Sequence, residues 1–145
     1  MAALVVAVGN TLRGDDGVAH RVADLLGARP EVDVRRVHQL TPELAEEMAH
    51  ATTVVFVDAD VEASAVRLER LTPNAQRAPI THTMTPNELV MLAERLYGFQ
   101  GAAYLCRVPA EDFAAGGALT PVAEAGARAA ARKVAELLNL TVEIL

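Results

Sequence analysis

The sequence has 145 residues and contains one cysteine, one serine, one lysine and no tryptophan. A single cysteine excludes a disulfide framework and a four-cysteine zinc site. Aromatic residues make up only 3% of the chain, which leaves little material for stacking nucleobases. The net charge of −6 disfavours a surface that follows nucleic-acid phosphates. The single serine, Ser64, does not lie in a Gly-x-Ser-x-Gly elbow, which excludes a serine hydrolase of that type.

Long apolar runs are also missing. No run approaches the roughly 18 residues that a membrane-spanning helix requires. The opening MAALVVAVGN has no basic region before its apolar stretch, so it predicts a first strand rather than a signal peptide, and we expect a cytoplasmic protein. Cys106 lies in the apolar segment AAYLCRV, which favours a buried thiol over a nucleophile.

The residues that are present predict one globular domain over 1–145, because 52% are hydrophobic and 22% are charged. Short apolar or alternating runs predict strands at 4–8, 32–37, 53–57, 65–71 and 102–108. Helical spacing between Thr-Pro and Gly boundaries predicts helices at 16–26, 41–50, 85–97 and 120–138. We expect loops at 72–83 and 109–119, and a short strand or tail at 141–145. This order predicts an α/β fold, a single three-layer domain with a mainly parallel twisted sheet between helices.

Acidic residues follow two of the predicted strands. Asp15 and Asp16 lie in the turn 9–17 after the first strand, and Asp58 and Asp60 follow the third. Sites in parallel sheets form outside the carboxyl ends of the strands, so we expect these carboxylates at one edge. Several like charges at one edge repel one another, and a bound cation or a cationic substrate group would offset that repulsion.

A histidine would complete a metal site at this edge. The stretch THTMTP places His82 on a loop before a predicted helix, where it is able to reach the acids. One histidine with two carboxylates, here Asp16 and Asp58, is a suitable three-ligand set for nickel or zinc with open positions.

Each of these residues also has a purely structural interpretation. Asp15 and Asp16 would be favoured at a helix N-terminus by the backbone dipole and the free N–H groups. Asp58 at the end of a strand is a common turn former, and His82 taken alone is an ordinary loop residue. The sequence by itself leaves both interpretations open.

The remaining histidines and the glycine-rich turn are weaker candidates for a functional site. His20 follows Asp16 by four residues and would be able to join a ligand pair, but an exposed helix position is favoured. His38 and His50 are expected to be structural or exposed. The turn 9–17 has neither GxGxxG nor GK[ST], and its paired aspartates would repel a phosphate, so we reject a dinucleotide or P-loop site.

Four segments of the sequence, taken in order, resemble one known family. They are VVAVGNTLRGDDGVAHRVADLL, VVFVDAD, THTMTPNELVMLAERLYG and VPAEDFAAGGALTPVAEAGARAAARKVAELL. They are similar to segments of the hydrogenase maturation proteases, the endopeptidases that process the large subunit of nickel-iron hydrogenases. The similarity extends over essentially the whole chain, and the GN-x-L-x-x-DDG opening is its most specific part.

The resemblance implies a single α/β domain in which Asp16, Asp58 and His82 contact a metal. It implies an endopeptidase that removes the C-terminal extension of a NiFe-hydrogenase large-subunit precursor. That precursor already holds nickel, so the nickel would be presented by the substrate. In this family the three ligands are thought to recognise the nickel and thereby align the nearby peptide bond for hydrolysis.

The sequence departs from the family pattern at two places. Some members have Glu at the position of Asp16, so the carboxylate here is carried on a shorter side chain. Some members also have an Asp-Gly-Gly-Thr stretch after the second strand, where this chain has His38-Gln39-Leu40-Thr41. The second departure leaves an alternative function open, a non-catalytic metal- or partner-binding module on the same scaffold.

Overall fold

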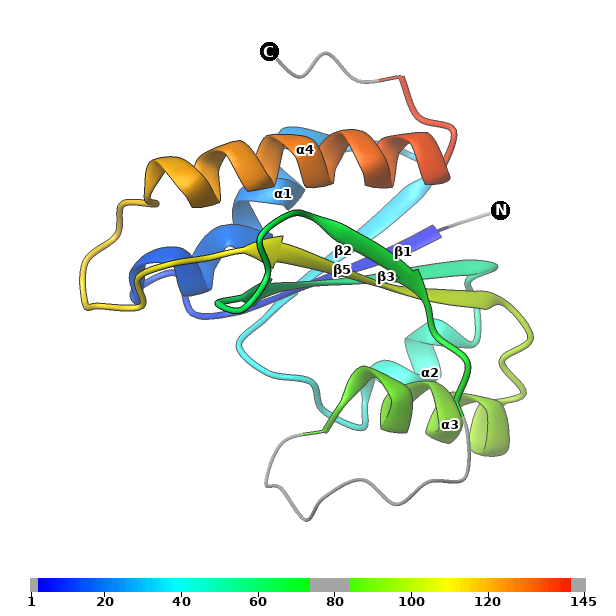
Figure 1. Ribbon diagram of the computed structural model, residues 1–145. Coiled ribbons are helices and arrows are strands. Elements are labelled where there is room, and N and C mark those ends of the chain that lie inside the picture. Colours follow the sequence, from blue (N-terminus) through cyan, green and yellow to red (C-terminus); the bar gives the residue numbers. More distant parts are fainter. Residues whose placement is uncertain (1–2, 74–83, 142–145) are drawn as a thin grey trace.

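A computed structural model describes residues 3–73 and 84–141 of the chain. These residues form a five-stranded sheet with the order β2-β1-β3-β5-β4. The strands are β1 (Ala3–Val8), β2 (Val32–Val37), β3 (Thr53–Asp60), β4 (Arg67–Arg70) and β5 (Ala102–Pro109). All neighbouring strands pair in parallel except β4, an antiparallel strand at one edge. The predicted mainly parallel sheet is therefore confirmed (Figure 1).

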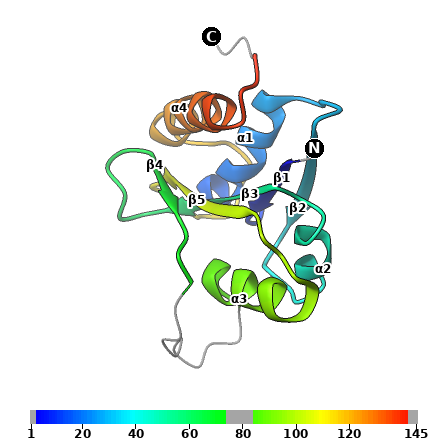
Figure 2. The same ribbon diagram turned by 90° about the vertical axis from the view of Figure 1, so that its right-hand side faces the viewer.

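Helices cover both faces of the sheet. They are the 3-10 helix η1 (Gly14–Gly17) and the α-helices α1 (Val18–Leu26), α2 (Leu44–Met48), α3 (Pro86–Tyr97) and α4 (Pro121–Leu137). Helices α1 and α4 lie on one face, and α2 and α3 lie on the other (Figures 1 and 2). This is the predicted three-layer domain. None of the helices within the described ranges has the length and apolar character needed to cross a membrane.

The central strands are apolar on both faces because both faces are covered by helices. Along β3, Val55 and Val57 pack in the core under α1 and α4, whereas Val54 and Phe56 pack in the core over α2 and α3. All four side chains are fully buried. The alternation continues into the polar end of the strand, so Asp58 shares the face of Phe56 and of α3.

Helix α4 packs closely on the sheet because its inner face consists almost entirely of small residues. The fully buried positions are Ala123, Ala127, Ala130, Ala131 and Val134. At Gly126 a Cβ atom would lie 3.1 Å from side-chain atoms of Val108 and Pro109. Small side chains therefore set the spacing between α4 and β5.

The start of α3 is fixed by its sequence. The Thr85 side chain accepts a hydrogen bond from the Glu88 backbone N–H, and the Glu88 carboxylate accepts one from the Thr85 N–H. This reciprocal capping box, with Pro86 at the first helical position, begins the helix where we predicted, and Gly98 in a left-handed conformation ends it after Tyr97, also as predicted. The N-terminus of α3 lies beside the end of β3, since Pro86 lines the same pocket as Asp58 and Asp60.

Several predicted boundaries differ from the structure. The helix expected at 41–50 is confined to Leu44–Met48, because Thr41 and Pro42 form turns that precede it. The helix expected from residue 16 begins at Val18, after the 3-10 turn. The strand expected at 53–57 continues to Asp60, because β5 keeps pairing with it as far as Pro109. Residues 74–83 of the expected loop and 142–145 of the expected tail lie outside the described residues.

We predict that Ala130→Leu lowers the free energy of unfolding by about 1–3 kcal/mol, because the larger side chain overpacks the contact between α4 and the sheet. Chemical denaturation followed by circular dichroism measures the change. Ala125→Leu makes the same substitution on the exposed side of α4 and should change stability by less than about 0.5 kcal/mol. Equal losses in the two variants would show that the α4 contact does not require small residues.

Candidate functional site at the carboxyl edge of the sheet

The structure brings Asp16 and Asp58 to the same edge of the sheet. Strands β1 and β3 are parallel direct neighbours, with Ala7 opposite Val57, so the turn after β1 and the end of β3 lie at the same edge of the sheet. Asp16 lies in η1, just after β1, and its negative charge raises the pKa of Asp58. Two carboxylates that are 42 positions apart in the numbering therefore interact electrostatically.

A compact turn after β1 holds the Asp16 carboxylate. Its Oδ2 accepts a hydrogen bond of 2.9 Å from the Asn10 backbone N–H. The Asn10 side chain in turn accepts a hydrogen bond from the Leu12 N–H, and the Asn10 carbonyl accepts one from the Arg13 N–H. The Gly-Asn dipeptide thus shapes the turn and positions one oxygen of the candidate ligand.

Gly9 is required at the beginning of this turn. Its φ is +149°, and a Cβ atom at this position would lie 1.8 Å from the backbone oxygen of Asp16. No other residue type fits there without moving the 3-10 turn. The carbonyl oxygen of Gly9 lies 2.8 Å from Nε2 of His20 on α1, so the imidazole N–H donates to it.

His20 therefore differs from the sequence interpretation. The helical pattern favoured an exposed position, but the side chain is 8% exposed and bonded to the Gly9 carbonyl. Its imidazole stabilises the turn through this hydrogen bond. His38 and His50 are exposed, as expected.

Asp58 lies within β3 rather than in a turn. Burial of its carboxyl group, reinforced by the charges of Asp16 and Asp60, raises its pKa to about 6 against the opposing effects of the Ala59 N–H and Arg107. The turn-forming role belongs to Asp60, whose Oδ1 accepts a hydrogen bond from the Glu62 N–H. Asp58 is thus an acid held where ionisation is disfavoured, which is a common property of functional carboxylates.

A pocket of about 280 Å³ adjoins Asp58. Its lining consists of Asp58, Ala59, Asp60, Pro86, Leu105 and Arg107. Arg107 lies opposite Asp58 in the β3–β5 register, and its Nη1 is 3.8 Å from Oδ2 of Asp60. Arg107 was not among the site residues predicted from the sequence, although its place near the end of a strand parallel to β3 was a usable signal.

The third predicted ligand, His82, lies outside the described residues. Within the described ranges, no three histidine, cysteine or acidic side chains are grouped so that they could hold a metal. The two candidate ligands that the structure describes, Asp16 and Asp58, lie at the predicted edge and interact electrostatically. Pro86, four residues after His82 in the sequence, lines the pocket beside Asp58.

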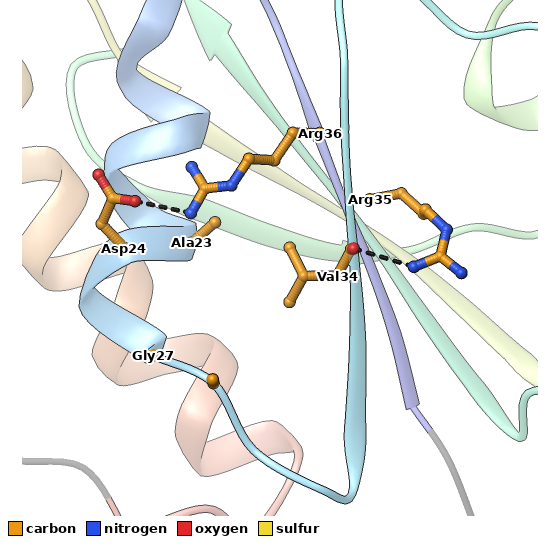
Figure 3. A pocket seen from close by; sticks show the side chains of 7 residues that line it. Ala23, Asp24, Gly27, Val34, Arg35 and Arg36 are labelled. Carbon is orange, nitrogen blue, oxygen red and sulfur yellow. Dashed lines mark hydrogen bonds and ion pairs between the residues drawn. The ribbon is translucent and has the colours of Figure 1, made fainter.

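A second pocket, of about 570 Å³, lies between the end of α1 and β2 (Figure 3). Arg36 points toward α1, where it pairs with Asp24 at 2.6 Å and donates to the carbonyl of His20. Arg35 donates to the carbonyl of Val34. These arginines have their partners within the protein, so this pocket is the weaker candidate for a functional site.

Cys106 does not contribute to the site. The side chain is fully buried in the core under α1 and α4, and burial raises the pKa of its thiol to about 12. The predicted buried, unreactive thiol is confirmed.

Comparisons with known proteins support the fold. Neither protein-family models nor curated protein sequences match this chain. Among solved structures, a hydrogenase maturating endopeptidase, HybD from E. coli, is 22% identical with a TM-score of 0.69, covering 96% of this chain and 93% of that one. A hydrogenase 2 maturation peptidase from a Thaumarchaeota archaeon is 23% identical with a TM-score of 0.70, covering 97% and 100% of the two chains.

A third solved structure is similar over the same length. The [NiFe] hydrogenase maturation protease HycI from Thermococcus kodakarensis is 19% identical with a TM-score of 0.73, covering 95% of this chain and 92% of that one. The chain has the fold of these hydrogenase maturation endopeptidases. The predicted α/β class and the arrangement of layers are confirmed by this likeness.

The raised pKa of Asp58 makes a prediction about stability in the metal-free protein. Because the folded pKa is about 6 and the ordinary value is 3.8, the folded state loses stability as pH rises from about 4 to 6. Asp58→Asn removes this charge and should raise the free energy of unfolding at pH 7.5 by up to about 3 kcal/mol. Urea denaturation with a chelator present, repeated between pH 4 and 8, measures the effect.

The gain from Asp58→Asn should fall to about 0.5 kcal/mol at pH 4, where the folded proteins carry an uncharged group at this position and only the unfolded Asp58 is partly ionised. Asp33→Asn removes an exposed acid on β2 and should change stability by less than about 0.5 kcal/mol at every pH. A gain from Asp58→Asn that is independent of pH would contradict the electrostatic explanation.

Proposed function

We propose that this chain is a cytoplasmic endopeptidase that removes the C-terminal extension of a NiFe-hydrogenase large-subunit precursor. In this proposal, Asp16, Asp58 and His82 recognise nickel that the precursor already holds. One observation carries the proposal: Asp16 and Asp58 meet at the carboxyl edge of a fold shared with proteins named as hydrogenase maturation endopeptidases.

The electrostatics of the edge favour a divalent cation. Asp16 and Asp58 repel one another, and their repulsion contributes to the raised pKa of Asp58. A cation between them would remove that cost, and carboxylate oxygens together with an imidazole nitrogen suit a borderline ion such as Ni²⁺. Since the proposed set has only three ligands, positions on the ion remain available for groups of the substrate.

The location of His82 in the sequence is consistent with this set. Pro86 begins α3 four residues after His82, and it lines the same pocket as Asp58. The capping box of Thr85 and Glu88 fixes that helix start. The described residues that follow His82 in the sequence therefore begin α3 beside Asp58.

The proposed reaction is hydrolysis of one peptide bond. The oxygen of a water molecule bonds to the carbonyl carbon, the C–N bond breaks, and a proton passes to the leaving nitrogen. Contact of Asp16, Asp58 and His82 with the nickel would hold the neighbouring peptide bond in one place, which lowers the entropic cost of the reaction. The pocket beside Asp58 offers space for part of the substrate next to this carboxylate.

We predict that Asp16→Asn, Asp58→Asn and His82→Ala each abolish processing. Each change removes one ligand and reduces the contact with the nickel of the precursor. The assay is incubation with a nickel-loaded large-subunit precursor, with the mass of the large subunit measured before and after. Precursor without nickel should remain full-length, and Asp33→Asn should process normally because it lies on the exposed part of β2.

The outcome also separates the endopeptidase from the alternative binding module. The altered stretch at 38–41 follows β2 at this same edge, and Leu40 within it is buried in the core. A complex that forms with the nickel-loaded precursor without shortening it would contradict the proposed hydrolysis and support the module. Processing that survives in one of the three variants would remove that residue from the proposed set.

A further inference from the structure

Asp15, next to the proposed ligand Asp16, has a different environment from the one that the sequence suggested. It is fully buried, and its carboxylate accepts four hydrogen bonds from the segment between β5 and α4. Oδ2 accepts from the N–H groups of Glu111 and Asp112 and from the Thr120 hydroxyl, at 2.8, 3.2 and 2.7 Å. Oδ1 accepts from the Thr120 N–H at 2.8 Å.

These contacts explain why a buried acid stays ionised here. Burial by itself raises the pKa of Asp15, but the hydrogen bonds from Thr120, Glu111 and Asp112 outweigh it and hold the pKa below its ordinary value. A helix N-terminus would supply donors from the residue's own helix, whereas these donors come from residues about 100 positions later. Asp15 therefore connects two distant segments.

Backbone hydrogen bonds join the same two segments. The N–H of Asp15 donates to the Asp112 carbonyl, and the N–H of Gly14 donates to the Gly116 carbonyl, each at 2.8 Å. The N–H of Gly116 donates to the Leu12 carbonyl at 3.3 Å. Residues 110–119 of the loop expected at 109–119, together with Thr120, thus lie against the turn that carries Asp16, as the left-hand end of Figure 1 shows.

Thr120 has two roles in this connection. Its hydroxyl donates to Asp15 and accepts a hydrogen bond from the Ala123 N–H, which caps the start of α4. A hydroxyl group has one proton to donate and lone pairs to accept, so both bonds form together. The start of α4 and the 3-10 turn are consequently fixed to the same carboxylate.

We propose that Asp15 is a positioning residue, whose buried carboxylate fixes the 110–120 segment to the 3-10 turn and thereby holds the Asp16 carboxylate in place. This inference rests on the proposed function of Asp16. Asp16 follows Asp15 directly, and its Oδ2 accepts from the Asn10 N–H. The turn is held by Asn10 and Gly9 on the β1 side and by Asp15 on the side of the 110–120 segment.

The experiment compares four variants of the full chain. Asp15→Asn keeps the shape of the side chain but replaces one carboxylate oxygen by an NH₂ group. That group would face the N–H and hydroxyl donors of the 110–120 segment. Thr120→Val removes the hydroxyl, and Thr120→Ser keeps it. Val134→Ala truncates a buried α4 side chain without touching either segment, and it serves as the destabilised control. The measurements are the stability of each variant, the kcat and KM for processing, and hydrogen exchange of backbone amides by NMR.

We expect Asp15→Asn and Thr120→Val to lower kcat/KM roughly ten- to a hundredfold at a temperature where both are folded, as displaced reacting groups do. The Asn10 amide, which reports on the Asp16 carboxylate, should shift and exchange faster in both variants. Thr120→Ser should restore both properties. Val134→Ala should lose stability yet keep its kcat/KM and the protection of the Asn10 amide.

The readouts distinguish this inference from the proposed function. Absence of processing by the unaltered chain would contradict the endopeptidase, and the Asn10 amide would still test whether Asp15 holds Asp16. If Asp15→Asn does not fold, the comparison of Thr120→Val with Thr120→Ser decides. An Asn10 amide that behaves alike in Thr120→Val, Thr120→Ser and Val134→Ala would overturn the positioning role.

Discussion

The close approach of the Asp16 backbone to Gly9 is the constraint on which the rest of the site depends. The carbonyl oxygen of Asp16 occupies space that any side chain at Gly9 would need. This packing folds the chain back on itself directly after β1 and presents Asp16 at the end of the sheet. His20 completes the arrangement from α1 by donating to the Gly9 carbonyl. The candidate ligand is therefore placed by backbone contacts, which leave it less freedom than a side chain on an open loop.

The same edge of the sheet concentrates like charges. On the helical surfaces, acids pair with arginines, as Asp24 does with Arg36 and Glu124 with Arg21. Asp58 instead lies near Asp16 and Asp60, and burial makes its charged form still less favourable. This clustering of like charges lowers the stability of the fold at neutral pH. Proteins commonly retain such clusters at functional sites. The apolar core on both faces of β3 compensates for this local loss.

The order of strands and helices was predictable because hydrophobic periodicity and Thr-Pro helix starts are local signals. The edge on which Asp16 and Asp58 meet was also predictable, since parallel strands direct their carboxyl ends to one side. The roles of Asp15 and His20 were not. Both depend on partners brought together by tertiary folding, the 110–120 segment for Asp15 and the Gly9 carbonyl for His20. Helix boundaries failed near Thr41 for the related reason that turns competed with the helix.

The register between β1 and β3 links the core to the chemistry. Side chains along β3 alternate between the two cores, so Phe56 and Asp58 face α3 while Val57 faces α1 and α4. A shift of one residue in the strand register would move every large side chain of β3 to the opposite face of the sheet. It would also turn Asp58 away from the pocket at Pro86. The apolar alternation that stabilises the sheet therefore also fixes which face receives the acid. Asp16 reaches that acid because β1 is the immediate neighbour of β3, so the candidate site requires the completed sheet rather than any single sequence motif.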